Sequence, residues 1–147
     1  MPTDLWSFAL ACYARPGVEA TCLRLQDDGA DVCLLLCALW LEWRRVASSA
    51  ERLAQLQEIA EPWQRQVVQP LRELRRAWKA AARHEPQLAK LRERIKVLEL
   101  EAERELLERL DQATRKWQAT DDAVAWLEQL VEDRGARELL RAAAVPT

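Results

Sequence analysis

An apolar pattern that repeats in steps of three and four residues constrains this chain more than any other feature. The repeat occupies Leu88, Leu91, Ile95, Leu98, Ala102, Leu106, Leu110, Ala113 and Trp117. Side chains at these steps share one face of an α-helix, so the pattern predicts a helix over residues 86–117. At 1.5 Å per residue such a helix is about 50 Å long. A helix of this length needs a partner, either an antiparallel hairpin with a helix over residues 62–84 or a coiled-coil dimer seam.

Composition favours helix throughout the chain. Glycine occurs only at Gly17, Gly29 and Gly135, and long stretches are rich in Leu, Ala, Glu, Arg and Gln. β-Branched residues are few and never alternate over the length of a strand. We therefore expect an all-α protein with a single helical domain over residues 1–147, in which a compact helical bundle carries the long hairpin.

Further helices are expected over residues 4–14, 16–27, 31–46, 50–60 and 120–135, followed by a short helix through Ala142. Residues 32–41, VCLLLCALWL, are apolar almost all round and should form the central helix. Gly29 should end the preceding helix in the left-handed conformation. Pro62 should begin the first arm of the hairpin, and Pro70 inside that arm should cause a kink or a break.

The same apolar segment bears on location. Its ten residues are too few for a hydrocarbon core that needs about 20. The N-terminal MPTDLWSF carries an acid where a secretory signal has basic residues. Four cysteines, Cys12, Cys22, Cys33 and Cys37, lie in apolar helical segments and should be buried free thiols rather than zinc ligands. We expect a cytoplasmic protein with no membrane span, no metal and no bound cofactor.

Charge is distributed unevenly along the chain. Residues 1–61 carry 5 basic and 9 acidic side chains, residues 62–96 carry 10 and 3, and residues 97–147 carry 7 and 12. This order predicts either pairing within the fold or a basic surface for a partner.

Asp27, Asp28 and Asp31 form a D-D-x-x-D pattern within LQDDGADVC. In prenyl-transferring enzymes this spacing holds Mg²⁺ because the first and last acids share a helix face. Here Gly29 interrupts the pattern. We favour a turn between two helices, in which Asp31 caps the second one. The metal site remains the alternative.

A basic stripe is the most suggestive surface feature. It consists of Arg72, Arg75, Arg76, Lys79 and Arg83. Four of these, at positions 72, 76, 79 and 83, share a helix face. The stripe can bind a protein or a nucleic acid, or it can pair across the hairpin with acids of the second arm, Glu99, Glu101, Glu103, Glu105 and Glu108. Pairing or solvation within the fold is the favoured interpretation.

Aromatic residues beside arginines suggest a second contact patch. Trp43 and Trp63 flank charged segments, and Arg44 and Arg45 follow Trp43 directly. Such pairs are typical of protein interfaces.

The N-terminal third of the chain contains an LWxFAL…PxV…CLxLQD…DVxLLL…LWL pattern. Its residues are Leu5, Trp6, Phe8, Tyr13, Pro16, Val18, Cys22, Leu23, Leu25, Gln26, Asp27, Asp31, Val32, Leu34–Leu36 and Leu39–Leu41. With this pattern the chain resembles an uncharacterised family of small proteobacterial proteins of unknown function. Residues 67–79, VVQPLRELRRAWK, resemble a second block of that family. The resemblance implies a bacterial origin and no known activity.

These observations favour a non-catalytic helical interaction or adaptor protein. Its partner would be another protein, or a second copy bound through the long helix. The only histidine, His84, has no serine or cysteine beside it in a nucleophile motif. The alternatives are a metal-dependent helical enzyme that acts on a phosphorylated substrate through Asp27, Asp28 and Asp31, and a nucleic-acid-associated protein that uses the basic stripe.

Overall fold

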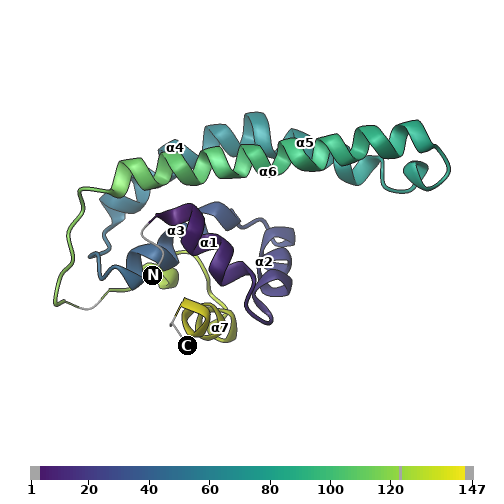
Figure 1. Ribbon diagram of the computed structural model, residues 1–147. Helices are drawn as coiled ribbons and strands as arrows, with labels where there is room; N and C mark the ends of the chain where they lie inside the picture. The colour runs from purple at the N-terminus through teal and green to yellow at the C-terminus, as the bar shows by residue number, and fades with distance from the viewer. Residues whose placement is uncertain (1–3, 123, 145–147) are drawn as a thin grey trace.

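The computed structural model describes residues 4–122 and 124–144, and it is helical, as predicted (Figure 1). Its α-helices are α1 (Leu5–Tyr13), α2 (Val18–Asp27), α3 (Val32–Trp43), α4 (Ala50–Trp63), α5 (Gln69–Ala77), α6 (Pro86–Thr114) and α7 (Arg134–Ala144). Shorter turns are η1 (Gln64–Val68), η2 (Ala81–Arg83) and η3 (Leu127–Gln129). The described residues contain no strand beyond an isolated bridge between Val46 and Ala119.

Helix α3 is the central element, as its composition predicts. Every residue from position 32 to 41 is buried, and α3 contacts α1, α2, α4, α6 and α7. The chain reaches α3 through a turn in which Gly29 is left-handed, with φ of 99°. In that turn the Ala30 amide donates to the Leu25 carbonyl, which closes the end of α2.

The long hairpin is present, but its first arm differs from the prediction. That arm starts at Ala50, and Pro62 lies inside α4 instead of beginning a helix. Pro62 and Glu58 are both exposed, so water can bond the Glu58 carbonyl that proline leaves without a donor. The helix then passes through the π-helical turn η1 just before Pro70, and it ends at Ala77 rather than at residue 84. Helix α6, the second arm, ends at Thr114, three residues before the predicted end.

The hairpin lies across the helical cluster, and its far end extends beyond it (Figure 1). Burial reflects this arrangement. Helix α5 has no buried residue, and the buried residues of α6 begin only at Glu99. The turn that joins the two arms therefore stands clear of the core.

The prediction of a continuous helix over residues 120–135 is wrong. Among the described residues of this range, helical structure is limited to the short turn η3 and the start of α7. Tertiary contacts hold the segment against the end of α3. The Trp126 side chain is fully buried and donates to the Val46 carbonyl at 2.8 Å. The Leu127 amide donates to the Glu42 carboxylate at 2.8 Å. Gly135, expected to end this helix, instead lies in the first turn of α7.

Two further expectations concern the apolar helices. All four cysteines are buried and unbonded to one another, as predicted. Within the described residues, none of the helices combines the length and apolar character that crossing a bilayer requires.

Candidate functional site

Asp31 occupies the turn before α3 and caps that helix, as expected. Its Oδ1 atom accepts a hydrogen bond from the Leu34 amide at 3.1 Å and another from Gln64 Nε2 at 2.8 Å. Burial raises the pKa of Asp31, and the two hydrogen bonds oppose that shift. Asp31 therefore links the start of α3 to the π-helical turn of the hairpin.

The other two acids of the D-D-x-x-D pattern have different surroundings. The exposed Asp27 carboxylate pairs with Arg76 at 3.0 Å. Asp28 is exposed at the end of α2. Among the described residues, no group of three or more His, Cys, Asp or Glu side chains is placed to hold a metal ion.

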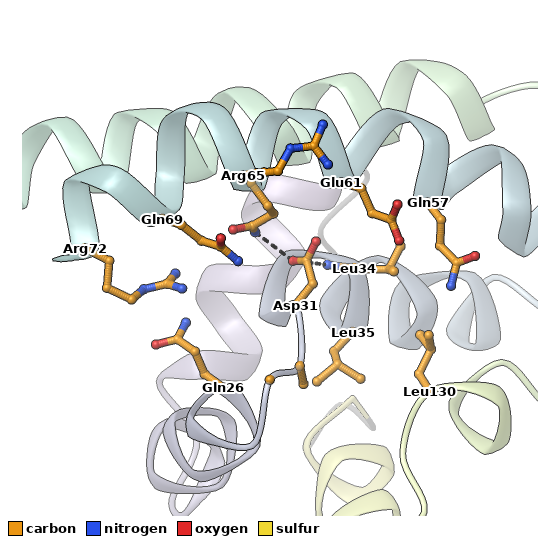
Figure 2. Close-up of a pocket in the computed structure, with 13 residues that line it drawn as sticks. Gln26, Asp31, Leu34, Leu35, Gln57, Glu61, Arg65, Gln69, Arg72 and Leu130 are labelled. Atoms are coloured by element: carbon orange, nitrogen blue, oxygen red, sulfur yellow. Dashed lines mark hydrogen bonds between the residues drawn. The ribbon is translucent and has the colours of Figure 1, made fainter.

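A polar cleft of about 470 Å³ lies between this turn and the first arm of the hairpin. Figure 2 shows Asp31 near its centre, with Glu61 and Arg65 on the hairpin side and Leu35 opposite. Four carboxamides, Gln26, Gln57, Gln64 and Gln69, also line it, together with Arg72. The cleft offers both hydrogen-bond donors and acceptors, but the side chains that line it include no serine, cysteine or histidine.

The basic stripe is divided between buried pairs and free charges. Arg72 and Arg75 both pair with the buried Glu99 of α6, at 3.3 and 2.6 Å. The hydrogen bonds from Arg75 to Glu99 raise the pKa of the Arg75 guanidinium. This is the pairing across the hairpin that the charge order allows.

The remaining basic residues lie toward the exposed end of the hairpin. Arg76 pairs with Asp27, whereas Lys79 and Arg83 are exposed. Within the described chain, the side chains of these last two residues form no hydrogen bond or ion pair. His84 is also exposed at the end of η2, while the cysteines are buried in the core.

Glu103 extends the charged cluster that Arg72, Arg75 and Glu99 form beneath the hairpin. From the sequence, Glu103 was named only as one of the acids that could pair with the basic stripe. Burial raises its pKa to about 7, and the nearby Glu99 carboxylate adds to that shift. Arg72 and Arg75 oppose it. The buried Cys33 thiol donates to the Glu103 backbone carbonyl at 3.8 Å, which places α3 directly under this cluster.

The Trp–Arg patch engages other parts of the same chain. Arg44 donates to the carbonyls of Thr114 and Trp117, at 3.2 and 2.8 Å. Arg45 adopts a left-handed conformation, with φ of 63°, and its carbonyl accepts from the Thr120 amide. These contacts hold the chain that follows α6.

The two tryptophans of that patch are half-buried. Trp43 packs against Phe8 with ring centroids 5.7 Å apart. Trp63 donates to the Ala102 carbonyl at 2.8 Å, and the Arg109 guanidinium covers its ring at 4.0 Å. Trp63 thus joins the two arms of the hairpin.

The sequence did not reveal the outer face of α6, which adjoins the buried face that carries Ala102, Leu106 and Leu110. We define this outer face by Lys90, Leu91, Arg94, Val97, Leu98, Glu101 and Glu105. The exposed fractions of Leu91, Val97 and Leu98 are 47%, 56% and 46%. Leu91 and Leu98 belong to the apolar repeat that was expected to be buried. Val97, next to Leu98, was the signal in the sequence for this outer face, because it widens the apolar stripe of α6 beyond a single helix face.

The fold is that of an all-helical protein with a projecting hairpin. A family model described as "Protein of unknown function (DUF2390)" matches residues 4–110, and the chain belongs to this family. No curated protein and no solved structure matches the chain.

Proposed function

We propose that this is a non-catalytic interaction protein whose partner binds the projecting part of the hairpin. The observation that carries the proposal is the exposure of Leu91, Val97 and Leu98 on the outer face of α6, at 46–56%. Monomeric proteins rarely expose grouped apolar side chains without a partner, because their contact with water is unfavourable.

The inner side of the hairpin supports the same proposal. Arg72 and Arg75 are tied to the buried Glu99, and Trp63 is bonded to α6. These contacts fix the two arms to each other, so the outer face is presented on a rigid element. Preorganisation of this kind lowers the entropic cost of association.

Free charges around the apolar side chains would form the rim of the interface. Lys79 and Arg83 at the turn are exposed, as are Lys90 and Arg94 on α6. Rim charges guide association more than they add affinity. Trp43, Arg44 and Arg45 remain a weaker candidate contact, since they contact other parts of the same chain and so stabilise the fold.

Capture from native cells tests the proposal with a matched control. The tagged chain is compared with the double variant Leu91→Glu/Leu98→Glu and with Leu10→Glu/Leu23→Glu. Leu10 and Leu23 are 50% and 44% exposed on α1 and α2, so the control places the same charges at equally exposed sites. We expect the α6 variant alone to lose the co-purifying protein, with circular dichroism unchanged in both. Equal recovery with both variants would contradict the proposal.

A further inference from the structure

We propose that the outer face of α6 binds a second copy of the same chain in antiparallel orientation, with the two-fold axis close to Leu98. This inference rests on the proposed function and names its partner. It follows from the order of charges along one exposed stripe, not from exposure alone.

The charge of the outer face changes from positive to negative along the helix. Lys90 and Arg94 precede the apolar side chains Val97 and Leu98, and Glu101 and Glu105 follow them. A second chain that runs in the opposite direction therefore places its acidic half on the basic half of the first. A parallel arrangement would bring like charges together, which destabilises the pair.

The spacing of the stripe suits helix pairing. Leu91, Arg94, Leu98, Glu101 and Glu105 are separated by three, four, three and four residues, which is the seam of a two-helix contact. A two-fold axis near Leu98 brings the two Leu98 side chains together at the centre. The same patch then serves both copies, as a symmetric dimer requires.

Most charges of this stripe are unpaired within the chain. Among the described residues, the side chains of Lys90, Arg94 and Glu101 form no hydrogen bond or ion pair. Glu105 pairs with Arg109 at 3.0 Å, with both side chains 45% exposed, so that pair holds the Glu105 carboxylate weakly. By contrast, the inner arginines Arg72 and Arg75 share Glu99, and Arg92 donates to the Arg75 carbonyl at 2.8 Å. The outer charges are thus free to meet a partner.

Site-directed cross-linking tests the orientation and the axis. Leu98→Cys and Leu91→Cys introduce thiols at equally exposed positions, and the native cysteines are buried. With the axis at position 98, two thiols at 98 meet, whereas two thiols at 91 lie about 21 Å apart along the helices. A short bismaleimide should therefore link the Leu98→Cys chains and leave the Leu91→Cys chains single. Equal linking of both variants would indicate a parallel contact and overturn the proposal.

Charge exchange provides a second test, read by light scattering. Arg94→Glu and Glu101→Arg should each weaken dimerisation by about tenfold, and the double variant Arg94→Glu/Glu101→Arg should restore it, since opposite charges face each other again. A double variant no better than the single ones would overturn the charge argument. If the unaltered chain stays monomeric and Leu98→Cys does not link, self-association is wrong. The capture experiment then decides the proposed function separately, because it needs no second copy.

Discussion

Asp31 joins two structural tasks in one carboxylate. It caps α3 and also accepts from the Gln64 side chain in the hairpin, so its loss affects both elements. Both of these contacts stabilise the fold. The capping role follows from the sequence, because a short acid directly before a long apolar helix is a typical N-cap.

Asp31→Ala should lower the free energy of unfolding by about 2 kcal/mol, since it removes a cap and leaves the largely buried Gln64 amide without its acceptor. Urea denaturation followed by circular dichroism measures this loss. The control is Asp28→Ala, an exposed acid three residues earlier, which should change stability by less than about 0.5 kcal/mol. Equal losses in the two variants would refute the capping account.

Glu103 should make stability depend on pH. Its pKa is about 7 in the folded chain, compared with an ordinary value of 4.5, so the folded state binds more protons than the unfolded state between these values. This group therefore stabilises the fold below about pH 4.5, and that contribution is lost as the pH rises toward 7. Replacing it by a neutral isostere, Glu103→Gln, removes the dependence.

The comparison is made by urea denaturation of both chains at pH 5 and at pH 8. Relative to the unaltered chain, Glu103→Gln should gain stability at pH 8 compared with pH 5. Parallel pH profiles would show that the Glu103 carboxyl has an ordinary pKa. Using the difference between the two chains cancels the other acids, such as Asp31, that titrate in both.

At the scale of residues, the sequence predicted only those interactions that join residues close together in the chain. The cap by Asp31 spans three residues and was predicted. The Asp31–Gln64 contact joins residues 33 positions apart, and the shared Glu99 joins residues 24 and 27 positions apart. Such contacts depend on how the hairpin sits on α3, which no short pattern encodes.

At the scale of elements, Glu99 connects the two arms of the hairpin. It is buried between Arg72 and Arg75, and the Arg75 contact is the shorter at 2.6 Å. Its removal would leave two partly buried guanidinium groups without the carboxylate that both of them pair with. The free-energy cost of leaving these partly buried charges without that carboxylate exceeds the small contribution of an exposed ion pair to stability.

Glu99→Gln should therefore lower the free energy of unfolding by about 2–3 kcal/mol in thermal or urea denaturation. Glu93→Gln is the matched control on the same helix, because its pair with Lys96 is exposed. That variant should change stability by less than about 0.5 kcal/mol. A Glu99→Gln chain as stable as the control would mean that the inner pairs do not hold the hairpin together.

Apolar periodicity in the sequence predicted the helices that their own side-chain pattern determines. The existence of α3 and α6 follows from apolar patterns, and both formed close to the expected positions. The prediction that Pro62 begins a helix was wrong because proline is tolerated on an exposed helix face, where water satisfies the freed carbonyl. The helix expected over residues 120–135 failed because Trp126 and Leu127 bond to α3, and these contacts override local preference.

At the scale of the whole molecule, the fold separates a packed cluster from a projecting hairpin (Figure 1). The apolar repeat of α6 continues past the point where the cluster can cover it, so that Leu91 and Leu98 reach solvent. Sequence alone left open whether this repeat serves a hairpin or a dimer seam. The structure gives its inner face to the hairpin, and the outer face is left for the proposed second copy.

Sedimentation equilibrium at several protein concentrations tests this central claim most directly. It is run at about 0.1 M and about 1 M salt, where the screening length falls from about 10 Å to about 3 Å. The account predicts a mass that rises from 17.0 kDa toward twice that value with concentration, and an association that weakens at high salt. A constant mass of 17.0 kDa at every concentration and both salt levels would contradict it.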